Sequence, residues 1–264
     1  FTLREPLGVV ALLTPWNFPL AIPLWPAAPA LAFGNTVVLK PSEMSSLVAS
    51  LLAESAAAAK LPPGVFNVVY GTGQAVGTPL LRQPEVRGIS FTGSSAVGAV
   101  VAGIAAERNV RFQTEMGGKN VVIVGPDADL DAAAALTAAG AMRYAGQKCT
   151  ATSRVVVVKD VEHDFLSRLK AQVERLPLGP VDDPAAAVGP LISARSRDAI
   201  SQALRDGNAD PIFGGRLPND PRFTRGFFFA PLVIRFADAD APLAQRELFG
   251  PVLGTLVADD LDHA

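Results

Sequence analysis

Residues 7–14 read Leu-Gly-Val-Val-Ala-Leu-Leu-Thr, and a proline-rich turn, TPWNFP, begins on the last residue of this short apolar run. Comparable β-branched and aromatic runs recur downstream, at residues 36–40 (TVVLK), 65–70 (VFNVVY) and 88–92 (GISFT). Their length and composition predict β-strands. The segments 45–60 and 94–108 are rich in alanine and predict helices. This alternation indicates an α/β fold with a mostly parallel, doubly wound sheet of the Rossmann-like kind.

The strand and helix pattern restarts after residue 120. Residues 121–124 (VVIV) and 154–158 (RVVVV) predict strands, and a helix is expected from about residue 129 to 145, with Asp127 or Asp129 as its cap. Farther on we expect a helix over 194–205, an irregular excursion over 206–225 and an apolar strand over 226–234. Gly117-Gly118 makes a natural hinge, because glycine permits backbone angles that other residues avoid. We therefore expect a cofactor-binding domain over 1–117 and a second α/β, catalytic domain over 118–264.

The composition of the chain argues against a nucleic-acid-binding protein and against a membrane-spanning one. The chain has 264 residues and 49% hydrophobic content, enough to bury a large core. A net charge of -2 gives no basic field for a phosphate backbone, so no nucleic acid partner is expected. The apolar stretch 20–33 is interrupted by prolines and is shorter than the roughly 20 residues of a membrane span. One cysteine cannot form an internal disulfide, which favours a cytoplasmic location.

That one cysteine, Cys149, lies in GQKCTATSR (residues 146–154), where small and polar neighbours surround it. Positive charge from Lys148 and nearby backbone N–H groups would stabilise a thiolate, so the motif is typical of a nucleophile. The alternative is a small buried hydrophobic side chain, which is the commoner role of a lone cysteine. Both interpretations stay open at this level.

If Cys149 forms an acyl–sulfur bond, the reaction also needs an oxyanion donor and a general base, and an amide and a carboxylate elsewhere in the chain could supply them. Asn17, in the turn after the first strand, could donate its amide N–H to an oxyanion. Glu115, in EMGGKN (residues 115–120), could act as general base on a water that cleaves an acyl–sulfur bond. Taken alone, the first residue could equally be a turn asparagine and the second a solvated charge at a strand end.

Further polar residues follow the second and fourth predicted strands, where ligands bind in doubly wound sheets. Lys40 and Glu43 are suited to ribose hydroxyls, and Gly93 with Ser94 opens a helix whose N–H groups could hold a pyrophosphate. Both motifs could also be ordinary helix caps. The glycines of residues 71–77 (GTGQAVG) have one residue too many for the dinucleotide fingerprint. No cluster has metal-ligand spacing, and His163 is expected to be a solvated surface residue.

The order of these motifs is more specific than any one of them: PWNFP, KPSE, FTGS, EMGGKN, GQKC and, at residues 247–252, ELFGPV. The chain resembles the aldehyde dehydrogenase superfamily from end to end. The resemblance implies that Cys149 is the nucleophile, Glu115 the general base and Asn17 the oxyanion donor. It also implies oxidation of an aldehyde to a carboxylate through a thiohemiacetal and a thioester. The presence of the glutamate argues against the branch that transfers its acyl group to coenzyme A.

The same resemblance assigns the cofactor and the substrate. The cofactor residues it implies are Trp16, Lys40, Glu43, Gly93, Ser94, Glu247 and Phe249, and the substrate residues are Phe18 and Trp25. The carboxylate of Glu43 repels a 2′-phosphate, which favours NAD, although members with a similar loop can also accept NADP. The surroundings of Cys149 are most similar to the ketoglutarate semialdehyde enzymes, so the expected substrate is a semialdehyde.

Family chains extend beyond both ends of this one, so we expect the cofactor-binding domain to be incomplete at its N-terminus and the catalytic domain at its C-terminus. The family usually forms dimers or tetramers, through segments that this chain lacks. Two alternatives to the dehydrogenase stay open: a catalytically impaired dinucleotide-binding fragment, and a thiol esterase that needs no cofactor. NAD-dependence of turnover would separate them.

Overall fold

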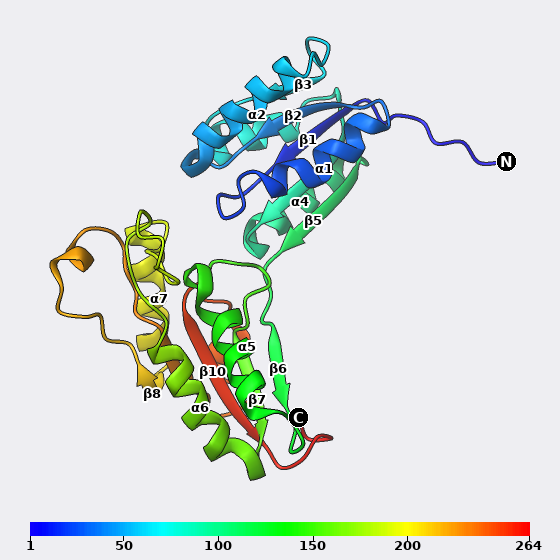
Figure 1. Ribbon diagram of the computed structural model, residues 1–264. Helices are drawn as coiled ribbons and strands as arrows, with labels where there is room; N and C mark the ends of the chain where they lie inside the picture. The colour runs from blue at the N-terminus through cyan, green and yellow to red at the C-terminus, as the bar shows by residue number, and fades with distance from the viewer. The chain divides into compact units, whose positions relative to one another are not determined.

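The computed structural model describes residues 1–264, which form two compact units, Phe1–Gly117 and Gly118–Ala264 (Figure 1). Each unit contains its own five-stranded sheet. No helix in either unit has the length and apolar character needed to cross a bilayer.

The first unit is a parallel sheet with the strand order β3-β2-β1-β4-β5. Its strands are β1 (Val9–Leu13), β2 (Thr36–Lys40), β3 (Phe66–Val68), β4 (Val86–Gly93) and β5 (Arg111–Met116). The apolar run 7–14 supplies β1, the central strand, of which Ala11 and Leu12 are fully buried. Short β-branched strands covered on both faces are typical of a parallel α/β sheet.

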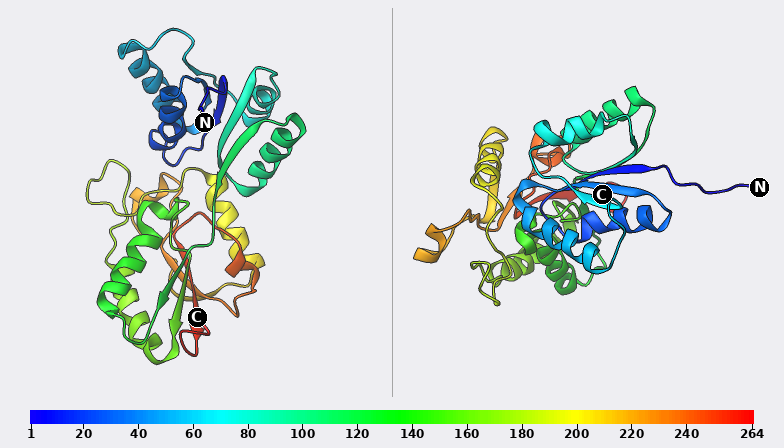
Figure 2. Two further views of the ribbon diagram at one scale, coloured as in Figure 1. Left: turned by 90° about the vertical axis from the view of Figure 1, so that its right-hand side faces the viewer. Right: turned by 90° about the horizontal axis from the view of Figure 1, so that it is seen from above.

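Helices cover both faces of this sheet. They are α1 (Ala21–Ala32), α2 (Ser46–Ala58), α3 (Thr78–Leu81) and α4 (Ser95–Arg108). Alternate residues of β1 point to opposite faces, so Leu12 packs in a cluster with α1 and α2, and Ala11 packs in another with α3 and α4. The left view of Figure 2 shows α1 and α2 on one side of the strands and α4 on the other. The predicted doubly wound fold is confirmed for this unit.

The second unit has a mixed sheet with the order β6-β7-β10-β9-β8. Its strands are β6 (Val121–Val124), β7 (Arg154–Val158), β8 (Asp210–Gly214), β9 (Leu232–Arg235) and β10 (Val252–Ala258). All neighbours pair in parallel except β8, which runs antiparallel to β9 and has an irregular register between Pro211 and Phe213. The two edges of the sheet are β6 and β8.

One large hydrophobic core joins this sheet to its helices, α5 (Leu130–Met142), α6 (Glu162–Glu174) and α7 (Ala194–Asp206), and to the short α8 (Pro242–Gln245). Phe165 and Leu169 of α6 are fully buried in it. The left view of Figure 2 shows α5 and α6 on one side of the strands and α7 on the other. Asp129 caps α5 by accepting hydrogen bonds from the N–H groups of Asp131 and Ala132.

Three details of the sequence-based prediction were wrong. The excursion over 206–225 contains strand β8, which its Pro211 and its polar first residue concealed. The apolar segment 226–234 contributes only its last residues to β9, because Phe227 pairs instead with Leu191 in an isolated bridge. Helix α5 ends at Met142 and not at residue 145, because Arg143 is extended and Tyr144 and Ala145 then adopt left-handed backbone angles.

The core of the first unit predicts that truncating two leucines has different effects on stability. Leu39 of β2 is fully buried and Leu47 of α2 is 75% exposed. We expect Leu39→Ala to lower the free energy of unfolding by about 2–5 kcal/mol, since it leaves a cavity. Leu47→Ala should change it by less than about 0.5 kcal/mol. Urea denaturation measures both, and equal losses would contradict the assignment of the core.

Candidate functional site

In the first unit, the predicted cofactor residues gather at one edge of the sheet. Leu13 of β1 pairs with Lys40 of β2 and with Phe91 of β4, so these parallel strands end side by side. Asn17, 4% exposed, follows β1, and Ser94 follows β4. This is the carboxyl edge of the sheet, where ligands bind in such folds.

Lys40 and Glu43 form an ion pair at this edge. The Lys40 ammonium is 3.7 Å from a Glu43 carboxylate oxygen, and the two side chains are 8% and 48% exposed. Burial holds the lysine in place, while the carboxylate can accept hydrogen bonds from a ligand. The hydroxyl of Thr14, at the end of β1, is also buried and has no hydrogen-bond partner in the chain. A buried hydroxyl without a partner fits a site that binds a polar ligand.

Gly93 and Ser94 lead from β4 into α4. A side chain at Gly93 would begin 2.6 Å from the tip of the Phe91 ring, so any larger residue at the end of β4 would have to displace that ring. The Ser94 side chain makes no capping hydrogen bond to α4, which leaves its hydroxyl available beside the first N–H groups of the helix. Such a helix start is suited to a phosphate.

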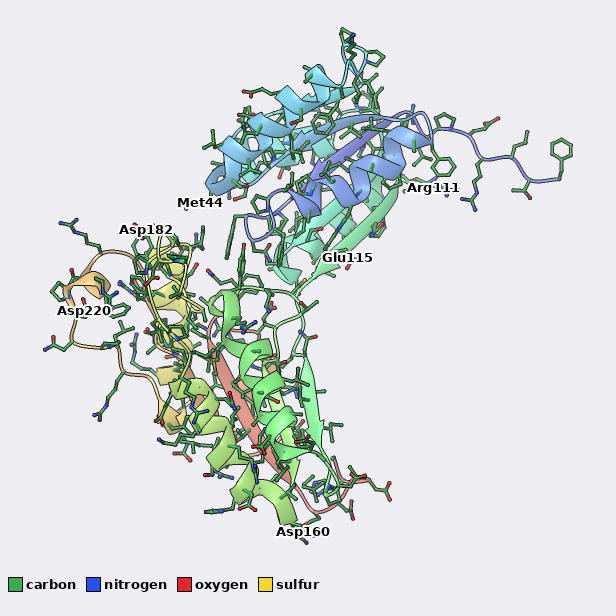
Figure 3. The ribbon with its side chains drawn as sticks, viewed as in Figure 1. Met44, Arg111, Glu115, Asp160, Asp182 and Asp220 are labelled. Atoms are coloured by element: carbon green, nitrogen blue, oxygen red, sulfur yellow. The ribbon has the colours of Figure 1, made fainter.

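Glu115 lies on the edge strand β5, opposite Thr92 of β4 (Figure 3). Its side chain is exposed and accepts a 3.3 Å hydrogen bond from the amide of Gln113. Trp16 and Phe18 are partly buried in the turn around Asn17. Trp25, the other predicted substrate residue, is 68% exposed on α1.

In the second unit, the candidate residues lie before strands and not after them. Cys149 precedes β7, Glu247 and Phe249 precede β10, and Gly118 precedes β6. Because these three strands are parallel neighbours, the segments before them meet at the amino edge of the sheet. Cys149 is a free, partly buried thiol.

We call residues 143–153 the cysteine loop. Three consecutive residues in it, Tyr144, Ala145 and Gly146, have φ angles of 63°, 52° and 66°. Non-glycine residues rarely adopt these angles, and each one costs about 1–3 kcal/mol, so the loop is held in place by its contacts. One contact is made by Gln147, 6% exposed, whose side-chain oxygen accepts a 2.9 Å hydrogen bond from the Ile192 N–H.

We call residues 246–251 the ELFGP loop, and it packs directly on the cysteine loop. A Cβ atom at Gly146 would lie 2.2 Å from the carbonyl oxygen of Gly250, so the two backbones touch. Phe249 has a φ of 52°, which is unusual for an aromatic residue. The strain is therefore shared by both loops.

A pocket lies between these loops. It is lined by residues of the cysteine loop, of the ELFGP loop and of their neighbours, namely Gly118, Gly146, Lys148, Ala151, Thr152, Ser153, Glu247, Leu248, Phe249, Gly250 and Val252. It thus contains a carboxylate and an aromatic ring, and it borders the cysteine loop on both sides of Cys149.

Burial disfavours charge on Glu247, which lines the pocket, and on Lys119 near it. Desolvation lowers the pKa of Lys119 from 10.5 to about 8, helped by Arg154 and opposed by Glu247. Desolvation also raises the pKa of Glu247. A hydrogen bond from the Gly118 N–H and the attraction of Lys119 lower that pKa, but by less. Each group is thus harder to charge than in water, although they are neighbours of opposite sign, because burial outweighs their attraction.

Lys119 and Asn120 belong to the EMGGKN motif, but nothing in the sequence pattern assigns them a role. The Lys119 ammonium donates a 2.8 Å hydrogen bond to the Arg246 carbonyl, in the ELFGP loop. The Asn120 amide donates to the carbonyls of Cys149, at 2.8 Å, and Ala151, at 3.0 Å. Their position directly after the glycine pair was the only available signal, since long-range hydrogen bonds leave no local pattern.

The contact between the loops predicts that Gly146 cannot be replaced. Gly146→Ala places a Cβ against the Gly250 carbonyl in a left-handed residue, so we expect a loss of more than about 1 kcal/mol in unfolding free energy. Gly103→Ala is the control, because Gly103 lies in α4 with nothing within 4 Å of a built Cβ. It should be neutral or stabilising by about 0.5–1 kcal/mol. Urea denaturation compares the two, and a harmless Gly146→Ala would contradict the close contact.

The lowered pKa of Lys119 predicts a pH-dependent stability. The folded-state pKa, about 8, lies below the 10.5 of the free side chain. Between these values the unfolded chain binds more protons, so the contribution of Lys119 to the free energy of unfolding rises with pH. Below about pH 8 its burial penalty is present in full.

The advantage of wild type over Lys119→Met should therefore grow from pH 8 to pH 10. Chemical denaturation at several pH values measures it. A difference between the two proteins that does not change with pH would show that Lys119 is not desolvated.

The chain as a whole matches known proteins of one family. The model of the aldehyde dehydrogenase family matches residues 1–264. An alpha-ketoglutaric semialdehyde dehydrogenase of Bacillus subtilis is 38% identical, over 100% of this chain and 55% of the relative. A 2,5-dioxopentanoate dehydrogenase of Saccharolobus solfataricus is 40% identical over the same shares. The chain thus spans about half the length of these curated relatives.

Solved structures agree with these relatives. The crystal structure of a Mycobacterium tuberculosis aldehyde dehydrogenase complexed with NAD+ is 37% identical, with a TM-score of 0.93 over 98% of this chain and 54% of that one. A likeness over 98% of the chain includes both α/β units. The chain therefore belongs to the aldehyde dehydrogenase family.

Proposed function

We propose that the protein carrying this chain oxidises an aldehyde to a carboxylate with NAD(P)+, using Cys149 as nucleophile. The observation that carries the proposal is the strained cysteine loop, which borders a pocket containing Glu247 and Phe249. Strained backbone concentrates at functional sites, where the surrounding contacts hold it in place. A buried structural cysteine would need no such arrangement.

In the overall reaction, an aldehyde, NAD(P)+ and water are converted to a carboxylate, NAD(P)H and two protons. The Cys149 thiolate forms a C–S bond to the carbonyl carbon, and the Asn17 amide donates a hydrogen bond to the oxyanion. Loss of a hydride from that carbon leaves a thioester on Cys149, and a nicotinamide cofactor held by Glu247 and Phe249 would supply the hydride acceptor. Glu115 then takes a proton from the water that cleaves the thioester, and the thiolate is released.

The residues of each unit fit parts of the cofactor. At the carboxyl edge of the first sheet, Lys40 and Glu43 would hold a ribose and Ser94 the pyrophosphate. Trp16 and Gly93 belong to the same edge. In the second unit, Glu247 and Phe249 would hold the nicotinamide ribose and ring. We propose a preference for NAD, because the half-exposed Glu43 carboxylate would repel the 2′-phosphate of NADP.

The proposed substrate is a semialdehyde. Two relatives bear the names alpha-ketoglutaric semialdehyde dehydrogenase and 2,5-dioxopentanoate dehydrogenase. The aromatic rings of Phe18 and Trp25 would contact the apolar part of such a substrate. Homo-oligomerisation and a cytoplasmic location stay predictions.

The test follows NADH formation by the full-length protein with acidic, aliphatic and aromatic aldehydes. Cys149→Ser should abolish turnover. Glu115→Gln should leave the first burst of NADH and slow the steady state by about 10²–10⁴-fold, because only thioester hydrolysis needs the base. Asn17→Ala should lower kcat by about 10²–10³-fold through the loss of an oxyanion donor.

Lys170→Met is the control, since Lys170 pairs with Glu174 on the surface of α6. Its kinetics should equal those of wild type. Ester hydrolysis by Cys149 that is indifferent to NAD, without NADH formation from any aldehyde, would replace the dehydrogenase with a thiol esterase. A folded protein without either activity would refute the proposal.

A further inference from the structure

Two adjacent residues at the start of the second unit each fasten a different loop of the pocket. We propose that Lys119 and Asn120 are positioning residues for the two halves of the reaction, the first for the cofactor-binding ELFGP loop and the second for the cysteine loop. The inference rests on the proposed function and adds to it a division of labour between neighbouring residues.

Asn120 fastens the cysteine loop through both its side chain and its backbone. Its amide nitrogen bridges the carbonyls of Cys149 and Ala151. Its own carbonyl accepts from the N–H groups of Ser153, at 3.1 Å, and Arg154, at 3.0 Å. Because these bonds begin at the nucleophile itself, Asn120 fixes the direction of the Cys149 peptide.

Lys119 fastens the other loop, the ELFGP loop. Its ammonium donates to the Arg246 carbonyl, one residue before Glu247, and lies 5.4 Å from the centre of the Phe236 ring. The Gly118 N–H donates to the Glu247 carboxylate. A charged donor makes a stronger hydrogen bond than a neutral one. The loop is thereby tied to the same backbone that carries Asn120.

The two attachments go to different loops although the residues are adjacent. Both residues directly precede β6, but the side-chain hydrogen bond of Lys119 goes to Arg246, whereas those of Asn120 go to Cys149 and Ala151. The two loops touch at Gly146 and Gly250, yet each substitution removes side-chain hydrogen bonds to one loop only. We therefore expect the larger effect of each substitution on the loop that it contacts.

The experiment measures the dissociation constant of NAD by calorimetry and the rate of the NADH burst in the full-length protein. Asn120→Asp keeps the shape of the side chain but sets an acceptor against two carbonyls. We expect the burst rate to fall by about tenfold to a hundredfold, while the dissociation constant changes by less than about twofold. Lys119→Met should do the reverse, with NAD bound about tenfold more weakly and a near-normal burst rate at saturating NAD.

Matched controls come from the chain itself. Asn67 makes the same kind of bridge in the first unit, to the carbonyls of Val37 and Gly64, so Asn67→Asp loses similar bonds away from the loops. Lys159, which pairs with Asp259, gives Lys159→Met. Both controls should keep the burst rate and the dissociation constant. Lys119→Arg retains a charged donor and should recover NAD binding to within about threefold of wild type.

The outcomes separate this inference from the proposed function. If the wild-type protein neither binds NAD nor forms NADH, the proposed dehydrogenase function is refuted, and the inference that rests on it is refuted with it. If wild type is active and both variants lose the same quantity, or the control variants lose as much, the division between the two residues is refuted. Melting temperatures of all variants identify a general loss of folding, and an Asn120→Ala variant, which adds no charge, repeats the test should Asn120→Asp not fold.

Discussion

The contact between the Gly146 and Gly250 backbones is the constraint on which the second unit depends. Two loops before parallel strands approach so closely that no side chain fits between them. The approach requires left-handed angles on one side and at Phe249 on the other. A pocket with a thiol loop as one wall and a carboxylate loop as the other exists because this contact is made. The large core beneath, with Phe165 and Leu169 fully buried, supplies the stability that sustains the strain.

The fold was largely predictable because the strands have the composition of buried parallel strands. The apolar run of β1 and the matching run of β2 alternate with alanine-rich helices, and this alternation leaves few topologies. β8 was missed because it is a short edge strand with a proline and polar ends. The early end of α5 was missed for another reason: Tyr144 and Ala145 adopt their angles under tertiary constraint, which local propensity does not encode.

The candidate site was predictable in its residues but not in its supports. Cys149, Glu115 and Asn17 were named from motifs whose order resembles one family, and Lys40, Glu43 and Ser94 followed from their positions after strands. Lys119 and Asn120 were not assigned roles, because their partners lie far along the chain, at Arg246 and Cys149. Composition also gave no sign that burial would work against charge on both Lys119 and Glu247. That effect depends on which residues surround them once the chain is folded.

The two edges of the second sheet have different tendencies to join other chains. Pro211 lies in the outermost strand, β8, pairs with Ile234 on its inner side and has no N–H to offer on the outer side. The irregular register beside it also twists the edge. This border is therefore poorly suited to recruit a further strand, which protects the molecule from aggregation through it. The opposite border, β6, has no proline and exposes Val121 and Ile123, so unwanted strand addition would begin there unless a neighbouring segment covers it.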